Sequence, residues 1–482
     1  MAIDLRSWLD QVSELGLLKE VRGADWNLEI GVLTELNARS KKHTLLFDEI
    51  KGYPKGFRVL TGAMLDSRRV ALTLGLDPST SDYDLVRAFK GRLSLDKVEA
   101  SAKDYPPKFV SSAPIMENVK GGDQVNMLSF PSPKWHELDG GRYIGTADCV
   151  ITKDPNSDWV NVGAYRIMVH NEKELGIHMS SGHHGRIHMM DALSKGEKRF
   201  PIVVSFGHHP LLFAVAGLEV PAGISEFNYA GAFARRSLEV VRGPLTGLPI
   251  PADSEVAIEG YVTGELKDEG PFGEFMGYYA GGRAKKPVIK VEAVYYRNNP
   301  IILGTAPGRP PYDYSYFRCP LRAALIWDVL EKAGISGIKG VWCHEAGYSR
   351  ALTVISLKQS YGGQAKQAGY IATQCRLGAF GRYVIVVDED IDPTNLYDVM
   401  WAVCSRTDPA TSIDIIKDTW DTPLDPMTEK SPGKLVEEYT GSRAMIFATK
   451  PISMVLRDSF PKIAESSPEI QRSVKEKYAA LL

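Results

Sequence analysis

Cysteine is scarce in this chain, and its few cysteines are not grouped in any familiar pattern. The sequence has 5 cysteines among 482 residues, and no two of them form a CxxC pair. Such spacing builds neither a disulfide framework nor a zinc site. We therefore expect reduced thiols and a cytoplasmic protein. The five are Cys149, Cys319, Cys343, Cys375 and Cys404.

Long apolar runs and an excess of charge are missing as well. No stretch of about 18 uncharged apolar residues is present, and Met1 is not followed by a basic region and an apolar run. We expect neither a membrane span nor a targeting segment. Lys and Arg total 57 against 59 for Asp and Glu, a balance that gives no support to a nucleic-acid partner.

Three common enzyme motifs are also absent. The sequence has no GxSxG, no Walker phosphate loop and no GxGxxG between a strand and a helix. These motifs mark many hydrolases, nucleoside triphosphatases and Rossmann dehydrogenases. None of those classes is therefore indicated.

The character of the sequence changes along the chain. An amphipathic helical pattern from Leu5 to Leu15 opens a mixed α/β segment. From about residue 120, short strand-like runs such as Val160 to Val169 are separated by Gly, Pro and Asn, which predicts a β-barrel or sandwich. Beyond Pro310-Pro311, an apolar helical stripe and then alternating strands and helices predict a separate α/β domain.

The first candidate functional group is an arginine in an apolar run. Arg166 ends the segment NVGAYR and is the only cation between Val160 and Val169. The plainer interpretation is a strand-end arginine on a solvated face. Because a guanidinium matches the geometry of a carboxylate, Arg166 could instead be a carboxylate receptor.

The second candidate is a group of histidines. Half of the ten histidines fall between positions 170 and 188. Imidazole binds divalent ions well, but no HExxH-type signature is present. Spacing alone leaves a metal site and an ordinary set of histidines both open. The residues are His170, His178, His183, His184 and His188.

The third candidate is a pair of carboxylates in a loop rich in Gly and Pro. Glu269 and Glu274 bracket Gly270, Pro271 and Gly273. Such a core cannot form a regular helix or a central strand. The two carboxylates could serve as an acid and an orienting group. Composition alone favours an ordinary acidic turn.

In their order and spacing, these segments resemble the UbiD family of reversible decarboxylases, which includes ferulic acid decarboxylase and the polyprenyl-hydroxybenzoate decarboxylases. The resemblance runs through nearly the whole chain. Each motif alone would be weak, but the set is specific. The motifs are NVGAYR at 161–166, SEFNYAGA at 225–232, EGPFGE at 269–274, GQAK at 363–366 and VDEDIDPTNLYDVMWAVCSR at 387–406.

The resemblance implies an α+β multidomain fold. Its parts are an N-terminal α/β domain over 1–118, a split β-barrel that binds prenylated FMN over 119–308, a connecting helix over 309–335 and a C-terminal α/β domain over 336–482 that also dimerises. It further implies a homodimer or a higher homo-oligomer such as a hexamer. A separate prenyltransferase would supply the cofactor.

The resemblance also implies a metal that bridges the protein and the cofactor phosphate. Its ligands would be Asn161, Glu226 and one histidine of the His183-His184 pair, with His184 preferred for its distance from Asn161. Hard oxygen ligands with one imidazole suit Mn2+ or Mg2+, and potassium often binds nearby in the family. Lys366 matches a lysine that contacts the phosphate. The other implied cofactor-binding residues are Ala164, Tyr165 and Arg166.

The implied catalytic trio is Arg166, Glu269 and Glu274. The substrate carboxylate would dock near Arg166, held by Glu269, and the substrate would form a covalent adduct with the prenylated flavin before CO2 leaves. Glu274 would deliver the replacing proton, so we expect an apolar pocket that favours its protonated form. The expected reaction is reversible, non-oxidative decarboxylation of an aromatic, heteroaromatic or α,β-unsaturated acid.

Two alternatives are kept: an FMN oxidoreductase on a split barrel, and a non-catalytic subunit of a multisubunit carboxylase. The Arg-Glu-Glu trio argues against both. One segment departs from the family, because many relatives have an acidic pair after the Pro-Pro, where this chain has Tyr312-Asp313. The aromatic residues there either shape the substrate pocket or belong to the core of the connecting segment. They are Tyr312, Tyr314, Tyr316 and Phe317.

Overall fold

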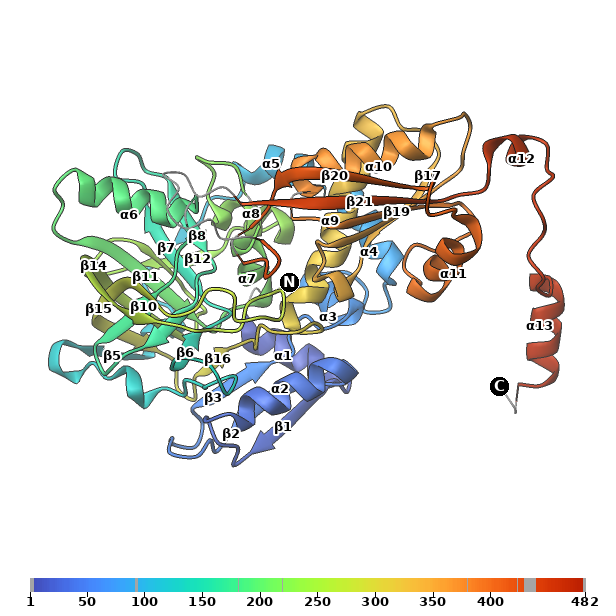
Figure 1. Ribbon diagram of the computed structural model, residues 1–482. Helices are drawn as coiled ribbons and strands as arrows, with labels where there is room; N and C mark the ends of the chain where they lie inside the picture. Colours follow the sequence, from blue (N-terminus) through green and yellow to red (C-terminus); the bar gives the residue numbers. More distant parts are fainter. Residues whose placement is uncertain are drawn as a thin grey trace.

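The computed structural model describes residues 4–91, 94–180, 182–218, 220–378, 380–422, 424–428 and 439–479. These residues form three connected units (Figure 1). A small N-terminal sheet, drawn in blue, lies below a large curved sheet drawn in green and yellow. A C-terminal unit, drawn in orange and red, lies at the upper right of the view. The predicted α+β arrangement is confirmed.

The N-terminal unit is built on a four-stranded sheet. Its order is β1 (Leu18–Arg22), β2 (Thr44–Asp48), β3 (Arg58–Thr61) and β16 (Ile301–Leu303). Because β16 comes from far along the chain, it ties this unit to the end of the central one. The predicted N-terminal helix is confirmed and buries its apolar stripe. The helices are α1 (Leu5–Glu14), α2 (Glu29–Ser40), α3 (Ser67–Thr73), α4 (Asp82–Lys90) and α5 (Leu95–Ala102).

The central unit is built on one nine-stranded sheet. Its order is β6-β9-β10-β15-β14-β11-β7-β8, with β5 paired to β15. A smaller sheet runs β13-β12-β4, and α6 and α8 pack near β8. The elements are β4 (Lys108–Phe109), β5 (Asn118–Gly121), β6 (Arg142–Gly145), β7 (Cys149–Lys153), β8 (Val160–Gly163), β9 (Ile167–Val169), β10 (Glu174–Ile177), α6 (His184–Ser194), β11 (Phe200–Phe206), α7 (Pro210–Ala216), α8 (Glu226–Ala234), β12 (Glu239–Arg242), β13 (Pro249–Pro251), β14 (Val256–Glu269) and β15 (Ala284–Tyr296).

Two short linkers force this large sheet to curl. β8 and β9 stand near opposite ends of the strand order, yet only Ala164, Tyr165 and Arg166 connect them. In a flat sheet the six spacings between these strands would cover roughly 29 Å. The linker reaches at most about 14 Å. Residues 146–148, between β6 and β7, impose the same closure. The sheet therefore curls into a half-barrel, and Arg166 lies at the seam where its two ends meet.

The single strand expected from Val160 to Val169 is wrong, because the chain forms two strands with different neighbours. β8 pairs with β7, whereas β9 pairs with β6 and β10. A Cβ at Gly163 would lie 2.3 Å from the ring of Tyr165, so a glycine lets Tyr165 fold back over the end of β8. This break directs Arg166 away from a solvated strand face.

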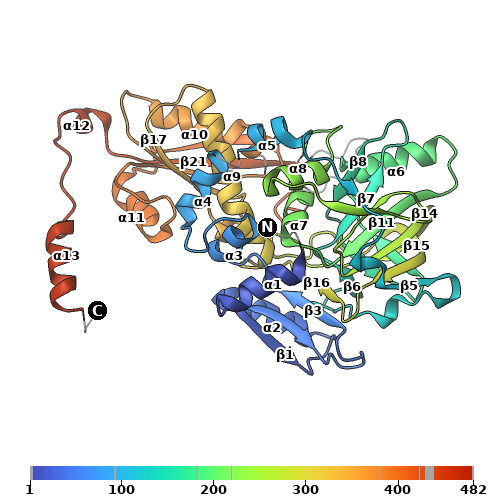
Figure 2. The ribbon, with the colours of Figure 1, turned by 180° about the vertical axis from the view of Figure 1, so that it is seen from behind.

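The C-terminal unit is a five-stranded sheet in the order β17-β18-β19-β21-β20. It follows α9, which begins after Pro310-Pro311 as expected, and α13 stands apart from the body in both ribbon views (Figures 1 and 2). Among the described residues, no helix has the length and apolar character needed to cross a bilayer. The elements are α9 (Asp313–Lys332), β17 (Ile338–Cys343), β18 (Leu352–Leu357), α10 (Gln364–Gln374), β19 (Tyr383–Asp388), α11 (Leu396–Arg406), β20 (Ile413–Trp420), β21 (Thr440–Ala448), α12 (Ile452–Leu456) and α13 (Pro468–Lys477).

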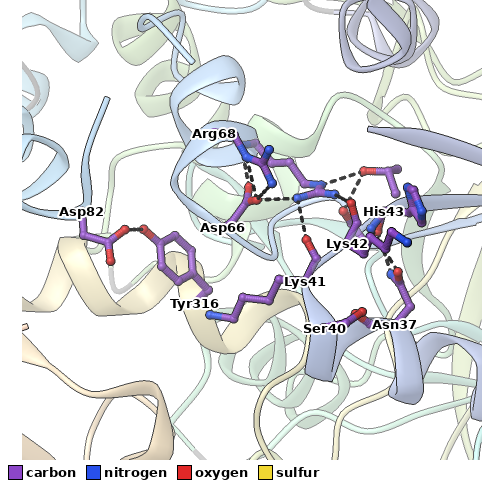
Figure 3. A network of polar contacts seen from close by, with 12 residues as sticks. Asn37, Ser40, Lys41, Lys42, His43, Asp66, Arg68, Asp82 and Tyr316 are labelled. Carbon is purple, nitrogen blue, oxygen red and sulfur yellow. Dashed lines mark hydrogen bonds and ion pairs between the residues drawn. The ribbon is translucent and has the colours of Figure 1, made fainter. Parts of the chain in front are cut away.

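The aromatic residues at the start of α9 belong to the core. All four, Tyr312, Tyr314, Tyr316 and Phe317, are buried in the largest apolar cluster. The hydroxyl of Tyr316 donates to Oδ1 of Asp82 at 2.5 Å, and the Lys41 ammonium lies 4.8 Å from the centre of its ring (Figure 3). These contacts make α9 the helix against which the N-terminal unit packs.

Asp313 fastens the start of α9 to the N-terminal sheet. Its Oδ2 accepts a hydrogen bond from the backbone N–H of Gly62 at 2.9 Å. Burial raises the pKa of Asp313 to about 6, although the backbone N–H groups of Gly62, Met64 and Ala63 favour its ionised form. The carboxyl thus provides an acceptor for a turn that would otherwise bury its donors unpaired.

Asp313→Ala should lower the free energy of unfolding by about 1–3 kcal/mol, because buried N–H donors lose their acceptor. Asp313→Asn keeps an acceptor oxygen and should cost less. Urea unfolding followed by tryptophan fluorescence would measure both variants. Equal stability of Asp313→Ala and the wild type would contradict this role.

Candidate active site

Three side chains from separate segments hold the guanidinium of Arg166. Its Nε and Nη2 donate to Oε1 and Oε2 of Glu269 at 2.8 and 2.9 Å, and its Nη1 donates to Oε1 of Glu274 at 2.5 Å. Nδ1 of His178 lies 3.0 Å from Nη2. The Arg166 side chain is only 11% exposed, so the solvated-face interpretation is wrong. The structure brings together the three residues that the sequence singled out.

Each partner is positioned by a different part of the half-barrel. Glu269 is the last residue of β14, His178 follows β10, and Glu274 lies in the loop between β14 and β15. That loop is neither helix nor strand, as expected, and it packs against Gly140. The N–H of Gly140 donates to Pro271 at 2.7 Å, and a Cβ on Gly140 would lie 2.0 Å from the Gly270 carbonyl oxygen. Position 140 must therefore be glycine, because the loop that carries Glu274 packs directly against its backbone.

Glu269 is an anion throughout the working pH range. Burial alone would raise its pKa, but its contacts with His178 and Arg166 outweigh burial and lower the pKa to about 2. Tyr143 adds a hydrogen bond, because its hydroxyl donates to Oε1 of Glu269 at 2.9 Å. Burial would lower the pKa of Arg166, yet Glu269 and Glu274 raise it above the ordinary value. Glu269 thus holds Arg166 and is unsuited to donate a proton.

Glu274 lies against a cation instead of in the apolar pocket that we expected. The contact between its Oε1 and Nη1 of Arg166 is an ion pair at 2.5 Å. The side chain of Glu274 is 12% exposed, so it is about as buried as that of Arg166. The expected proton donor is thus held directly against Arg166.

Sequence reasoning missed the roles of His178, Tyr143 and Lys286. His178 was noted only as one of several histidines, and neither Tyr143 nor Lys286 belongs to a motif. Lys286 lies two residues beyond Ala284, which pairs with Glu269, so Lys286 and Glu269 share one face of the sheet. Burial lowers the pKa of Lys286, and Glu269, Arg166 and Glu274 are among the charges that act on it. Only the strand register reveals this neighbour.

Asn161 and Glu226 meet at β8 and fit a cation site. Asn161 is buried, and its Nδ2 has no hydrogen-bond partner of normal geometry. Glu226 begins α8, and its Oε2 accepts the backbone N–H of Val162 at 2.6 Å. Burial raises the pKa of Glu226 to about 7. The amide oxygen of Asn161 and the carboxylate of Glu226 are hard ligands of the kind that suits a divalent ion.

The start of α6 lies near the same strand end. His184 is the first residue of α6 and its ring packs edge-on against Trp159 at 4.9 Å, while His183 stacks on Tyr165 at 5.4 Å. The Tyr165 hydroxyl accepts the N–H of Gly185 at 3.3 Å. In the part of the chain that the structure describes, no three His, Cys, Asp or Glu side chains are grouped to hold a metal. A site made of Asn161, Glu226 and one histidine contains only two residues of these four types, so this absence does not bear on it. The choice between His183 and His184 stays open.

The remaining predicted residues do not all gather here. Lys366 lies on α10, where its Nζ pairs with Asp414 at 2.9 Å and its side chain is 50% exposed. His188 faces Thr152, with Nδ1 3.2 Å from Oγ1. The histidine group is therefore divided among several places, with His178 at Arg166 and the His183-His184 pair at the start of α6.

Comparison with known proteins finds relatives that match most of the chain. Models for three domains of 3-octaprenyl-4-hydroxybenzoate carboxy-lyase match the chain: the N-terminal domain at residues 9–89, the Rift-related domain at 108–310 and the C-terminal domain at 315–448. The phenolic acid decarboxylase of Escherichia coli O157:H7 is 30% identical, over 99% of this chain and 98% of that protein. The phenolic acid decarboxylase of Streptomyces sp. strain D7 is 32% identical, over 97% and 96%.

A solved structure agrees with the sequence relatives. The UbiD-class enzyme HmfF from Pelotomaculum thermopropionicum, in complex with FMN, has a TM-score of 0.85 and 27% identity, covering 98% of this chain and all of that one. An evolved dimeric form of HmfF, solved with prFMN, has a TM-score of 0.81. These comparisons identify the chain as a carboxy-lyase. More particularly, the chain belongs to the UbiD family, and its three units have that family's architecture.

The Arg166–Glu269 pair should make folding stability depend on pH in acid. The pKa of Glu269 is lowered from 4.5 to about 2, so its contribution is complete above about pH 5 and is lost as the pH falls toward 2. That shift corresponds to at most about 3 kcal/mol. Glu269→Gln should be less stable than the wild type at neutral pH, and the difference should narrow from about pH 5 to pH 3.

Urea unfolding across this pH range would measure the difference. Glu265→Gln is a matched control, because Glu265 lies on the same strand with its side chain 41% exposed. The control should show a much smaller change. A Glu269→Gln deficit that stayed constant with pH would contradict the assignment.

Proposed function

We propose that this chain catalyses the reversible, non-oxidative decarboxylation of an aromatic, heteroaromatic or α,β-unsaturated carboxylic acid with prenylated FMN. The proposal depends on one observation: at the seam of the half-barrel, the buried Arg166 forms ion pairs with both Glu269 and Glu274. It combines a carboxylate receptor, an anion that orients this receptor and a second carboxyl group beside it. The phenolic acid decarboxylases among its relatives support the same chemistry.

The proposed cofactor site lies around β8 and the linker that follows it. A prenylated FMN, when bound, supplies an electrophilic carbon that bonds to the substrate and accepts the electrons released as CO2 leaves. Asn161, Glu226 and His184 would hold Mn2+ or Mg2+ against its phosphate, which the burial of Asn161 and Glu226 side by side at β8 supports. A potassium ion nearby is part of the proposal. The other proposed contacts are Ala164, Tyr165, Arg166, His183 and Lys366.

The residues of the trio would divide three tasks. Arg166 binds the substrate carboxylate, and Glu269 keeps the guanidinium in place. Glu274 transfers a proton to the carbon that has lost CO2. Since the pKa of Glu269 is lowered to about 2, Glu274 is the better candidate for this transfer. In the reverse direction, favoured by high CO2, the Glu274 carboxylate would take the proton back.

The wider assembly stays part of the proposal. The limits 1–118, 119–308, 309–335 and 336–482 are our working domains. The prenylated cofactor would come from a separate prenyltransferase, and the chain would act as a homo-oligomer. The dimeric form solved for HmfF supports association in this family.

Glu226→Ala and Asn161→Ala should each lose bound Mn2+ or Mg2+ and retain flavin poorly, because they remove the proposed bridge to the phosphate. Metal analysis and the flavin spectrum of protein coexpressed with a prenyltransferase would show this. His184→Ala and His183→Ala, compared with the control His188→Ala, would identify the histidine ligand. Full metal and flavin occupancy in both Glu226→Ala and Asn161→Ala would defeat the assignment.

Protein coexpressed with a prenyltransferase should decarboxylate at least one member of a panel of phenolic, heteroaromatic and acrylic acids. Glu274→Gln should keep its cofactor but lower kcat by roughly 100-fold or more, the usual scale of general acid catalysis. Arg166→Ala should weaken both binding and turnover, since it removes the carboxylate's partner and strands Glu269.

The controls separate this mechanism from the alternatives. The same protein loaded with ordinary FMN should be inactive toward the whole panel. Robust decarboxylation with FMN alone, or a Glu274→Gln variant as fast as the wild type, would rule the mechanism out.

A further inference from the structure

The hydrogen-bond donors of Arg166 are almost fully used. A guanidinium has five N–H groups. Nε and one N–H of Nη2 serve Glu269, and the second N–H of Nη2 points to His178. One N–H of Nη1 serves Glu274. Only one N–H of Nη1 is left, which is too few for a two-point contact with an incoming carboxylate.

Three of these donors are held by partners that cannot easily leave. Glu269 ends β14, where the ladder to β15 fixes it, and its own pKa of about 2 keeps it charged. Nδ1 of His178 lies 3.0 Å from Nη2 and 3.4 Å from Oε2 of Glu269. A neutral His178 with its proton on Nε2 accepts from Arg166, whereas a proton on Nδ1 is donated to Glu269. Burial lowers the pKa of His178, which favours that neutral state, and Arg166 and Lys286 act in the same direction.

Glu274 is the partner that can leave. It lies in the loop over residues 270–283, outside the ladder of β14 and β15. Its backbone is held by bonds with Tyr278 and Gly277, but the side-chain contact in the site is the single bond to Nη1. The loop is rich in glycine at this point, with Gly277 and Gly282 at φ of 91° and 61°. Exchange at Nη1 therefore leaves the rest of the arginine in place.

Charge makes the exchange selective. With Arg166, Glu269 and Glu274 all ionised, the trio carries one net negative charge. A substrate carboxylate entering beside an ionised Glu274 would place two anions against one nitrogen, and one of them must lose its charge or its partner. The other charged groups of the trio's surroundings are Lys286 and Glu269, which share one face of the sheet.

We propose that the substrate carboxylate displaces Glu274 from Nη1 of Arg166, and that the displaced Glu274 takes up a proton from water to become the proton donor. This rests on the proposed decarboxylation. The C–C bond then breaks, CO2 leaves, and the electron pair of that bond becomes available for a new bond to hydrogen at the same carbon. Glu274 gives its proton to that carbon and returns to Arg166 as a carboxylate. Each cycle consumes one proton and one carboxylate and releases CO2 and the protonated product.

The exchange explains why Arg166 and Glu274 form an ion pair in the enzyme without substrate. Before substrate binds, Nη1 of Arg166 holds the Glu274 carboxyl group at 2.5 Å. After CO2 leaves, the product has no carboxylate for Arg166. The Glu274 anion then reclaims Nη1 and helps to displace the product.

Proton uptake on binding tests the proposal without turnover. The full chain loaded with ordinary FMN would be titrated with 4-hydroxybenzoate at neutral pH in phosphate and in Tris buffer. The difference between the two binding heats gives the protons taken up. The wild type should take up about one proton for each acid bound. The neutral amide 4-hydroxybenzamide should cause none.

Two variants make the test specific. Glu274→Gln should bind 4-hydroxybenzoate without proton uptake, and roughly 10-fold more tightly, because no anion competes at Nη1. Glu274→Asp keeps a carboxyl group and should keep the uptake.

The proposal is overturned if the wild type binds the acid without taking up a proton, if Glu274→Gln takes up as much as the wild type, or if neither binds the acid. Decarboxylation by the prenylated holoenzyme is measured separately. Activity there without proton uptake would remove the exchange and leave the proposed function standing.

Discussion

The ion pair between Arg166 and Glu269 is the contact on which the rest of the site depends. Arg166 lies in a three-residue linker that must join the two ends of a nine-stranded sheet, and Glu269 ends the strand at the middle of that sheet. Their two hydrogen bonds, at 2.8 and 2.9 Å, tie the seam to the centre of the half-barrel. The contact that joins the two ends of the sheet to its centre therefore also positions the carboxylate receptor, Arg166.

The same pair separates the two glutamates into different roles. Glu269 receives hydrogen bonds from Arg166 and Tyr143 and lies beside His178, which fixes it as an anion. Within the part of the chain that the structure describes, the side chain of Glu274 bonds to Arg166 alone, and it lies on a glycine-rich loop, so its position can follow what occupies the arginine. Two like groups in unlike surroundings are a common way to separate an orienting group from a proton donor.

Much of this could be predicted from the sequence, and the misses have physical causes. Local patterns gave the N-terminal helix and the helix after Pro310-Pro311, because amphipathic spacing and proline act within a few residues. The split of Val160 to Val169 was missed, since it follows from a closure that only the strand order reveals. His178 and Lys286 were missed as site residues for the same reason. An apolar pocket was expected around Glu274 because the reaction needs its protonated form, but the structure places Glu274 against Arg166.

The most direct test is a crystal structure of the FMN-loaded protein with an aromatic acid bound. The account predicts the acid's carboxylate within hydrogen-bond distance of Nη1 of Arg166, with Glu269 still on Nε and Nη2 and Glu274 moved off the guanidinium. A bound acid whose carboxylate lies away from Arg166, with the Arg166–Glu274 contact intact, would contradict it.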